Sequence, residues 1–410
     1  MARIIKIIRM IRMKIKIIQN KYNHIFTILI LSFFSLPWGC HPRQDRDKSA
    51  EELIPNSSVA INYAEGFRIE HFNEFTKVTI NNPWTKDNKP YAVYYLYKED
   101  STGMDAGDEG IKLKIPISSL VVNSFSYFEF LYLLNEQHSI KGVTDGFRIY
   151  NSAILQKIES GEIIDLGDPF KPNIEKTMAL RPQAVINSAY AQVDRYSEQL
   201  IRAGFPVISS LEWMEKSPLA RAEWIKLIAA FFDKEVLGDS IFNDMEKRYL
   251  AIKEKVKSVS KQYAVLPGDN FQGTWYIPGG QSFNASLFRD AQLDYRYKNN
   301  SATGSIGLDI ESILTQFGNA EFWFGCDAGT YGELVEKDAK YLLLESVKKR
   351  HVYNNRNRVT PSGGNDYFES AVANPDLVLS DLIKAAYPEQ LLGYRFTYIK
   401  PLEEIPAREK

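Results

Sequence analysis

Side chains suited to holding a bulky, partly polar ligand gather in several loop-like stretches of this sequence. They are aromatic residues with hydroxyl and amide groups nearby: Tyr127, Tyr150, Tyr190, Trp275, Tyr276, Tyr367 and Phe368, beside Ser124, Ser126, Asn187, Gln272 and Asn365. Aromatic rings give wide apolar contact at a low cost in rotamer entropy, and hydroxyl and amide groups fix a ligand's orientation. Interior packing is the alternative role for each ring, so the prediction of a ligand site rests on the whole set.

Patterns typical of common catalytic and metal-binding sites are missing from the sequence. Its five histidines are far apart: His24, His41, His71, His138 and His351. A transition-metal site needs several imidazole, thiolate or carboxylate groups around one ion. The sequence also has no G-x-S-x-G elbow, phosphate-binding loop or H-E-x-x-H motif. We therefore expect no enzyme activity, no metal site and no resident cofactor, although a catalytic triad built from distant positions stays open.

Charge is distributed unevenly along the 410 residues. Seven Lys and Arg residues and no acidic residue precede position 40, although the formal net charge is only -1. Without those seven, 43 basic residues face 51 acidic ones, a net charge of about -8. A body of this sign has no general attraction to phosphate backbones, so nucleic-acid binding is disfavoured. The length and the 44% hydrophobic content predict two domains with large cores, or one large domain.

The first forty residues have the pattern of an export signal. A twelve-residue apolar run, Ile25 to Leu36, follows the basic stretch and precedes Gly39 and Cys40. Twelve residues are too few to span a hydrocarbon core, which needs ~20. The segment resembles a bacterial lipoprotein signal, which implies a signal peptide over 1–39, lipidation of Cys40 and a polar tether over 40–59. Plain secretion and an uncleaved anchor remain alternatives, and Pro37 stands where such signals usually have an aliphatic residue.

Strand-like and helix-like stretches alternate through the rest of the chain. This rhythm predicts α/β architecture with mainly parallel, buried sheets, preceded by paired strands over residues 68–80 and 91–97. Residues 218–232 predict an amphipathic helix, and apolar residues every three or four positions predict a second one over 235–258, which would be ~36 Å long. The second helix is long enough to connect two domains. We expect an N-terminal lobe over 60–232, a linking helix over 233–260 and a C-terminal lobe over 261–410.

Several segments together carry a resemblance to a known family. They are VVNSFSYFEFLYLL, IKGVTD, NIEKTMALRPQAVI and LIRAGFPVI in the first half, LEWMEKSPLARAEWIKLIAAFF between the halves, and YIPGGQSFNASLFRDA, TGSIGLDIESIL, VKKRHVYNNRNRV and PSGGNDYFESAVANPDLVLSDLI in the second. In order and spacing they resemble the periplasmic substrate-binding proteins of iron-siderophore, haem and cobalamin ABC importers, especially a Bacteroidetes-type lipoprotein subset. The resemblance covers about residues 60 to 400. It implies two Rossmann-like lobes joined by one long helix, with a ligand cleft between them.

The resemblance also implies which loops face this cleft. They are the turn Ser124, Phe125, Ser126 and Tyr127, the loop Asn187 to Gln192 with Tyr190, and the loop Gln272 to Tyr276 with Trp275. Tyr150, Asp366 and Tyr367 complete the expected ligand-binding set. Asp366 has a second interpretation, in which it caps the helix that follows. Arg148 and Arg296 are candidate cations for the ligand, with a surface role as the alternative.

Two glutamates are implied to dock on the permease. Asn173-Ile174-Glu175 and Asp309-Ile310-Glu311 each place an acid at the start of a helix. Held by a rigid body, Glu175 and Glu311 would both meet permease arginines only at the right lobe spacing. An ordinary first-turn acid, favoured by the helix dipole, is the alternative for each. Glu129, three residues after Ser126, fits a capping box and is assigned no function.

The implied function is capture of a nutrient outside the cytoplasm. The resemblance indicates a monomeric, lipid-anchored periplasmic protein that binds an iron chelate, a corrinoid or a haem-like ligand and delivers it to an ABC permease with its ATPase. A scaffold, or a carbohydrate-binding accessory of the same fold, is the second hypothesis. The sequence does not distinguish the three ligand classes. Cys326, the only cysteine besides Cys40, predicts a small buried apolar residue, and no disulfide is expected if Cys40 carries lipid.

Overall fold

A computed structural model describes residues 54–404 except 86, 88 and 99–109. The expected signal peptide, Cys40 and most of the expected tether lie outside the described residues. The last residues of that tether differ from the expectation, because Ser57 and Ser58 pair with a neighbouring strand. Within the described part of the chain, no helix combines the length and the apolar character needed to cross a membrane.

A small sheet comes first, and it is separate from the sheets of the two lobes. Its strands, in the order β1-β2-β3-β4-β5, are β1 (Ser57–Ser58), β2 (Phe67–His71), β3 (Thr76–Asn81), β4 (Pro90–Tyr97) and β5 (Ile111–Lys114). All neighbours are antiparallel except β4 and β5. The predicted run over 68–80 is thus two strands, divided by a turn in which Phe72 N–H donates to the Phe75 carbonyl at 2.9 Å.

The first lobe is an all-parallel sheet in the order β10-β9-β6-β7-β8. Its strands are β6 (Leu120–Val122), β7 (Ile140–Val143), β8 (Ile164–Asp165), β9 (Ala184–Ser188) and β10 (Val207–Ser210). Helices follow the strands: α2 (Ser126–Leu133), α3 (Ser152–Glu159), α4 (Ile174–Leu180) and α5 (Arg195–Arg202). Since β6 is wholly apolar and buried, both faces of the sheet must be covered, as expected for parallel strands.

The connection between the lobes consists of three helices rather than two. They are α6 (Pro218–Ala222), α7 (Trp224–Phe231) and α8 (Glu235–Lys255). The single helix predicted over 218–232 breaks at Glu223, whose carbonyl accepts from Lys226 N–H, a tighter i→i+3 bond. The predicted long helix is confirmed as α8, which at ~1.5 Å per residue is about 32 Å long.

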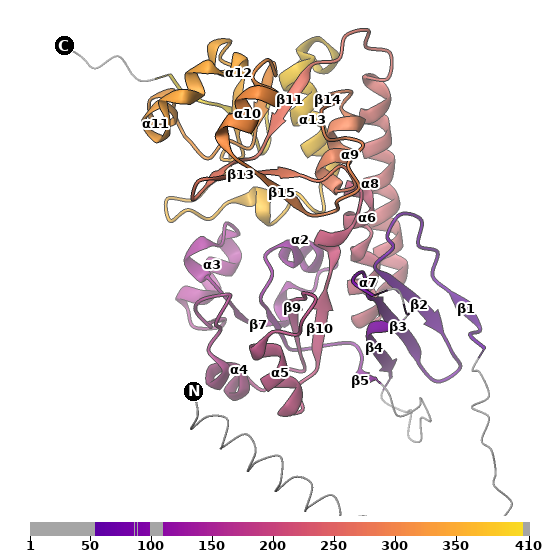
Figure 1. Cartoon of the computed structure of the whole chain (residues 1–410). Helices are drawn as coiled ribbons and strands as arrows, with labels where there is room; N and C mark the ends of the chain where they lie inside the picture. Colours follow the sequence, from indigo (N-terminus) through magenta and orange to yellow (C-terminus); the bar gives the residue numbers. More distant parts are fainter. Residues whose placement is uncertain (1–53, 86, 88, 99–109, 405–410) are drawn as a thin grey trace, which may run out of the picture. The chain divides into compact units, whose positions relative to one another are not determined.

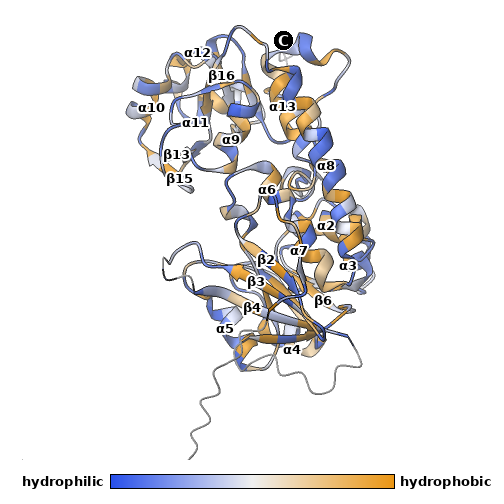
Figure 2. Cartoon of the chain, turned by 90° about the vertical axis from the view of Figure 1, so that its right-hand side faces the viewer, coloured by the Kyte–Doolittle hydropathy of each residue, from blue (hydrophilic) through white to orange (hydrophobic). Residues whose placement is uncertain are grey.

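The long helix contributes to the cores of both lobes. Phe242 and Met245 of α8 belong to the core of the first lobe, and Tyr249 belongs to the core of the second. Gly238 lies so close to α7 that a Cβ would approach the Ala229 Cβ to 2.5 Å, so only glycine fits. Figure 1 shows α8 running along one side of the two lobes, and Figure 2 shows the same helix from that side. The single helix α8 therefore packs into the cores of both lobes and connects them.

The second lobe repeats the α/β pattern with one antiparallel edge. Its main sheet has the order β14-β11-β16-β17-β18, with β11 (Ala264–Pro267), β14 (Asp294–Tyr295), β16 (Phe322–Phe324), β17 (Val352–Asn354) and β18 (Lys400–Pro401). Only β18 is antiparallel to its neighbour. A small antiparallel sheet, β12 (Asp269–Phe271), β13 (Thr274–Pro278) and β15 (Ser305–Leu308), was not predicted. The helices are α9 (Phe283–Asp290), α10 (Ile310–Phe317), α11 (Tyr331–Lys337), α12 (Glu345–Lys348) and α13 (Pro375–Ala386).

Candidate functional site

The two lobes touch along a polar seam formed by the residues before α3 and those around the 3-10 helix Asp366–Phe368. Glu369, only 3% exposed, accepts a short hydrogen bond from Tyr150 N–H and one of 3.0 Å from Asn151 N–H. Gly364 lies against the same stretch, where a Cβ would come within 2.2 Å of the Ile149 carbonyl oxygen. The second lobe thus binds the backbone of the first directly.

Acidic side chains are concentrated along this seam. Burial raises the pKa of Glu369 to about 7 although two N–H groups bind its carboxylate. Burial and the nearby Asp366 raise the pKa of Glu129, which reaches the seam from α2. Asp366 is paired with Arg358 at 2.9 Å, and the Arg358 guanidinium lies 5.6 Å from the centre of the Tyr150 ring. Asp366 and Glu129 therefore both interact with the Arg358 guanidinium, and Glu369 lies in the same seam.

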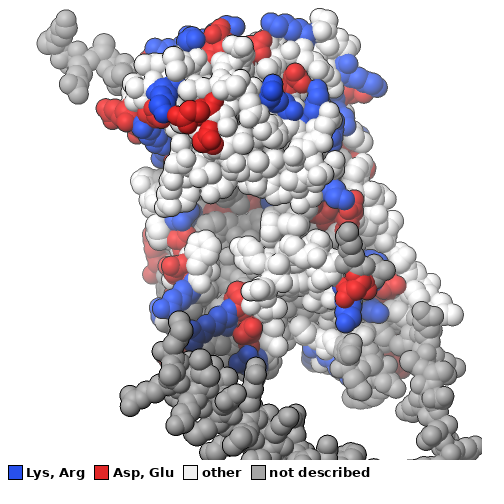
Figure 3. Space-filling view, viewed as in Figure 1, with Lys and Arg blue, Asp and Glu red and all other residues white. Residues whose placement is uncertain are grey.

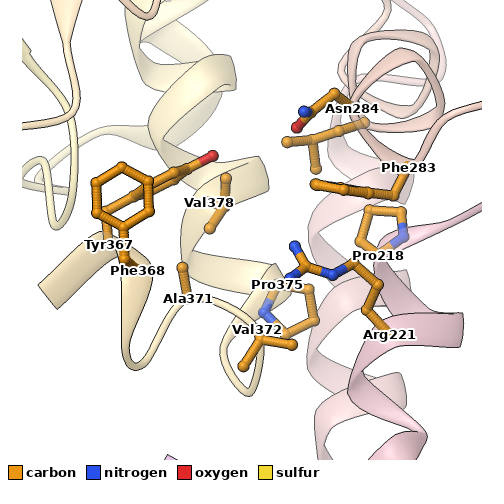
Figure 4. A pocket seen from close by; sticks show the side chains of 11 residues that line it. Pro218, Arg221, Phe283, Asn284, Tyr367, Phe368, Ala371, Val372, Pro375 and Val378 are labelled. Carbon is orange, nitrogen blue, oxygen red and sulfur yellow. The ribbon is translucent and has the colours of Figure 1, made fainter. Parts of the chain in front are cut away.

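A cavity of about 260 Å³ lies beside the seam, where α6, α9 and the segment before α13 meet. Figure 4 shows the Arg221 side chain reaching from α6 toward Pro375, with Phe283 on one wall and Tyr367 and Phe368 opposite. Most of the remaining lining is apolar: Pro218, Leu287, Ala371, Val372 and Val378. Val372 belongs to the core of the first lobe, whereas α9 packs in the second. The cavity lies where the two cores meet.

Arg221 is the charged group of this cavity. Its Nη2 donates to Glu212 Oε1 at 3.1 Å, and its guanidinium carbon lies 4.1 Å from the centre of the Phe283 ring. The arginine side chain is 19% exposed and Glu212 only 4%. Among the described residues, Arg221 Nε has no hydrogen-bond partner although it is buried. A planar guanidinium held by a carboxylate and a ring keeps N–H groups besides the one bonded to Glu212, and these can bind an anionic oxygen.

A second cavity of about 270 Å³ adjoins the first and shares Asn284, Leu287, Tyr367 and Val378 with it. It adds Tyr276, which is 45% exposed, from the small antiparallel sheet. The two together fall in the range of small-molecule sites, ~300 to 1,000 Å³. Figure 3 shows mainly uncharged atoms along the middle of the boundary between the lobes and charged side chains toward its ends. The arrangement suits a ligand with a large apolar or aromatic surface and a negative group.

Comparison with known proteins identifies the family. The family model described as "Periplasmic binding protein" matches residues 120–359, more than half of the chain. This chain belongs to the periplasmic binding protein family. It is similar to an uncharacterized lipoprotein of Methanocaldococcus jannaschii, with 23% identity over 82% of this chain and 84% of that protein.

Solved structures of similar fold extend the comparison. The Helicobacter pylori protein CeuE, with Ni(II) bound, has a TM-score of 0.54 and 18% identity, over 69% of this chain and 88% of that one. The triscatecholate siderophore binding protein FeuA of Bacillus subtilis, in complex with ferri-bacillibactin, has a TM-score of 0.51 and 20% identity, over 68% and 96%. These likenesses support the predicted two-lobe α/β fold of a periplasmic binding protein.

The structure brings only part of the expected ligand set to the cavities of this periplasmic binding protein. Tyr276 and Tyr367 line them. Trp275 is instead fully buried, with Nε1 donating to the Pro267 carbonyl and its ring 4.9 Å from that of Trp323. The reason is the alternation of β13, which turns neighbouring side chains to opposite faces.

The expected turn after β6 is largely packed away from both cavities. Tyr127 is 1% exposed, within the first core, and Ser126 is buried, with its hydroxyl 3.0 Å from that of Ser124. Phe125 is half-buried and packs against that core. Tyr190 is 49% exposed, but its ring lies against Trp213, 5.7 Å between centres. Neither Tyr190 nor any of the four residues Ser124 to Tyr127 lines either cavity.

Two capping expectations are wrong. The side chain of Asn365 accepts from Tyr367 N–H and caps the short helix, whereas the Asp366 carboxylate turns to Arg358. Tyr150, expected on the ligand, lies in the seam. The Ser126–Glu129 capping box is absent, because Phe125 is the N-cap and no side chain caps the helix. Glu129 approaches Asp366 of the other lobe instead.

Arg221 is the residue that the sequence reasoning missed. Arg148 and Arg296 were the candidates, but the exposed Arg148 pairs with the buried Asp145 at 3.1 Å and neither arginine lines the two cavities. The sequence pattern around Arg221 predicts an amphipathic helix and gives no sign of a ligand site. Its partners Glu212 and Phe283 are 9 and 62 positions away in sequence. The only hint in the sequence was that Arg221 is the first charged residue after Pro218 in a largely apolar predicted helix.

The two glutamates expected to dock on a permease are both exposed at helix starts. Glu175 is in the first turn of α4, capped by Asn173, and Glu311 is in the first turn of α10, capped by Asp309. Figure 1 shows α4 and α10 in different lobes. Glu311 also pairs with Lys340 at 2.9 Å, and this hydrogen bond lowers the pKa of Glu311.

Proposed function

We propose that this chain is the substrate-binding component of an ABC importer and that its cargo is an anionic metal chelate, either a ferric siderophore or haem. The observation that carries the proposal is Arg221, which enters a cavity with aromatic and apolar walls where the two lobes meet. Membership of the periplasmic binding protein family supports the importer role. The names of similar solved proteins, with Ni(II) or ferri-bacillibactin bound, support a metal or metal chelate as the cargo.

The chemistry of the site favours anionic chelates over a corrinoid. Catecholate and carboxylate oxygens are acceptors that a guanidinium can bind through two parallel N–H groups. Burial strengthens that attraction, because water screens the charges less. Cyanocobalamin is neutral overall, because its phosphodiester balances the charge of the cobalt centre, so a buried cation attracts it less than a chelate with a net negative charge. Tyr276 and Phe368 would cover the flat apolar parts of either anionic cargo.

The direct test is a titration of residues 41–410 with four compounds. A ferric tris-catecholate, a ferric hydroxamate, haem and cyanocobalamin are each added while tryptophan fluorescence is recorded. Saturable quenching by an anionic chelate, and none by cyanocobalamin, is expected. The iron-free catecholate serves as the control. Quenching by none of the four would overturn the proposal, as would mass spectrometry that shows the recovered cargo chemically changed, because the proposal has no enzymatic step.

Delivery to the permease would use Glu175 and Glu311. Each carboxylate stands exposed on a rigid lobe, and α8 holds the lobes on one rod. The double variant Glu175→Gln, Glu311→Gln should keep its affinity for the cargo and lose uptake into cells. An exposed acid away from both sites, Glu389→Gln, is the matched control. Loss of affinity in the double variant, or unchanged uptake, would contradict this role.

Membrane attachment through Cys40 is part of the proposal. The motif at the end of the apolar run and the similarity to an uncharacterized lipoprotein support it. The expected location is outside the cytoplasm, with the lipid holding the protein at the membrane. Cys40→Ser should move the protein from the membrane fraction to the soluble fraction. Retention of that variant in the membrane would instead favour an uncleaved anchor.

A further inference from the structure

A third cavity, of about 300 Å³, lies at the boundary of the lobes, and one of its walls is the turn that joins β3 to β4. Asn82 and Pro83 line it from this turn. Met214 and Lys216 line it from the segment between β10 and α6, and Thr303 lines it from the loop before β15 of the second lobe. The cavity therefore lies between both lobes and the sheet that precedes them.

The sheet β1 to β5 is an addition to the region that the family comparison describes. The family match begins at residue 120, after all five strands of this sheet. The turn after β3 nevertheless contacts the segment that holds Arg221. The ring of Trp84 lies 6.5 Å from that of Trp213, between centres, and Trp213 directly follows Glu212, whose carboxylate accepts from Arg221. The added sheet is therefore part of the surroundings of the candidate site.

The third cavity adjoins the cavity that contains Arg221. Lys216 lines the third cavity and Pro218 lines the first. Only Ser217 separates them, and its hydroxyl accepts from Ala220 N–H at 3.1 Å and caps α6. Since one residue extends a chain by at most ~3.6 Å, the Cα atoms of Lys216 and Pro218 lie within about 7 Å of each other. A ligand bound at Arg221 can therefore extend into the third cavity.

The charged side chains that line the third cavity, Glu65, Glu215 and Lys216, all have partners within the chain. Glu215 accepts from the N–H groups of Glu65 and Gly66 at 3.0 and 2.9 Å, and from Trp224 Nε1 at 2.8 Å. The Glu65 carboxylate pairs with Lys216 at 2.5 Å. These three side chains therefore leave no unpaired charge for an ionic group of a ligand.

Two neutral donors remain in this cavity. Asn82 Oδ1 accepts from Trp84 N–H at 3.0 Å, which orients the amide and leaves Nδ2 without a partner among the described residues. The Thr303 hydroxyl likewise bonds to no other residue in the part of the chain that the structure describes. Both groups can donate to a carbonyl oxygen. Leu211 and Met214 supply apolar contact beside them, so the cavity suits a neutral carbonyl group on a short apolar attachment.

We infer that the third cavity is a specificity subsite, in which Asn82 and Thr303 hold a neutral amide arm of the cargo while Arg221 holds its anionic centre. The inference rests on the proposed function, and it narrows the cargo to a chelate whose metal-binding rings carry amide substituents. A neutral hydrogen bond changes affinity by roughly 2- to 12-fold. The subsite therefore sets a preference among chelates, and Arg221 provides the common attraction.

The test compares two chelates of equal charge. Residues 41–410 are titrated with the ferric complexes of catechol and of 2,3-dihydroxy-N-methylbenzamide, each with three rings per iron, while tryptophan fluorescence is recorded. The two complexes differ in the amide arm. The unchanged chain should bind the amide complex about fivefold more tightly than the catechol complex. The iron-free rings at the same concentrations serve as the control for quenching.

The subsite variant is Asn82→Asp with Thr303→Val, which keeps the acceptor for Trp84 N–H and removes both donors. The matched control is Asn299→Asp with Thr85→Val, which makes the same chemical changes at exposed residues outside the three cavities. The subsite variant should bind the two complexes within about twofold of each other, and the control should keep the fivefold preference. Both should bind the catechol complex within about threefold of the unchanged chain, which shows that the first cavity is intact.

The outcomes separate this inference from the proposed function. Equal binding of the two complexes by the unchanged chain, or an undiminished preference in the subsite variant, would overturn the subsite and leave the proposed function standing. Tighter binding of the ferric complex of 2,3-dihydroxybenzoate than of the amide complex would assign the cavity to an acidic arm at Lys216 and also overturn the inference. If neither complex binds, the inference falls, and the titrations with the ferric hydroxamate and haem decide the proposed function on their own.

Discussion

Two regions at the boundary of the lobes each contain a buried charged group, and they differ in how that group is satisfied. In the seam, the Glu369 carboxylate receives two backbone N–H groups from the opposite lobe. In the neighbouring cavity, the Arg221 guanidinium binds Glu212 on one side and stacks on Phe283, but its Nε has no partner among the described residues.

This difference indicates two different tasks. A buried polar group whose partners are all supplied by the protein fixes structure, because removing any partner leaves an unpaired group away from water. A guanidinium that is partly exposed at a cavity and has one N–H bonded to Glu212 keeps further N–H donors for an anionic ligand. The seam therefore sets how the lobes meet, and the cavity leaves room for a ligand to complete its polar contacts.

The largest expected effect comes from breaking the seam. Glu369→Ala would leave the N–H groups of Tyr150 and Asn151 unpaired, at a cost of about 2 to 4 kcal/mol in the free energy of unfolding. Urea denaturation at pH 6 measures this change in the free energy of unfolding. Glu369→Gln keeps one acceptor oxygen and should lose less. Glu389→Ala, an exposed acid, should change stability by less than about 0.5 kcal/mol. Equal effects of the two alanine variants would show that the seam does not hold the lobes.

A pH series sharpens the same contrast. The pKa of Glu369 is raised to about 7 from 4.5, so the folded chain keeps a proton that the unfolded chain loses between these values. The unfolded state binds fewer protons there, and the free energy of unfolding must fall as pH rises from about 4.5 to 7 and then level off. This group's share is about 3 kcal/mol at most.

Urea midpoints measured at pH 5 and pH 8, for the unchanged chain and for Glu369→Gln, test this. The Glu369→Gln variant lacks the titrating carboxyl group, so its urea midpoint should fall less between pH 5 and pH 8. Some fall should remain, because burial also raises the pKa of Asp366 and Glu129. An identical pH dependence in the two proteins would rule out Glu369 as a source of it.

Local signals account for what the sequence predicted well. Asn173 and Asp309 were recognised at helix starts because a cap and a first-turn acid lie within three residues of each other. The periodicity that predicted the helix from 235 also needs only neighbouring residues, and the structure ends it three residues earlier than predicted, at Lys255. Such features can be predicted from the sequence because they depend on neighbouring residues and not on tertiary contacts.

Non-local contacts explain what the sequence could not show. Glu369 and Tyr150 are 219 positions apart, and no pattern in either segment indicates that one binds the backbone of the other. The break at Glu223 is equally non-local, since its carboxylate binds the N–H groups of residues 62–64 from the N-terminal segment. Trp275 and Tyr276 were grouped because they are adjacent, but a strand sends adjacent side chains to opposite faces. The sequence therefore predicted the kinds of side chain in the candidate site, but it predicted only some of the residues that line it.

The cavity side of the comparison is tested at Arg221. Arg221→Met keeps the apolar stem and removes the charge, so affinity for the ferric tris-catecholate should fall about 10- to 50-fold. Because Glu212 would then be buried without its partner, the double variant Arg221→Met, Glu212→Gln is measured as well. Both should lose affinity, while only the single variant should lose much stability. Full affinity in the double variant would remove Arg221 from the site.

The smallest expected effect separates two tyrosines of nearly equal exposure. Tyr276 is 45% exposed and lines the second cavity, whereas Tyr190 is 49% exposed and lies against Trp213 outside both cavities. Tyr276→Ala should weaken binding of the chelate three- to fivefold through lost ring contact, and Tyr190→Ala should leave it unchanged. The sequence analysis assigned both tyrosines to the ligand. Fluorescence titration of the two variants therefore tests whether the position in a cavity or the residue type better predicts which tyrosine contacts the ligand. An equal loss in both would mean that the bound ligand reaches beyond the two cavities to the loop after β9, and that these cavities form only part of the site.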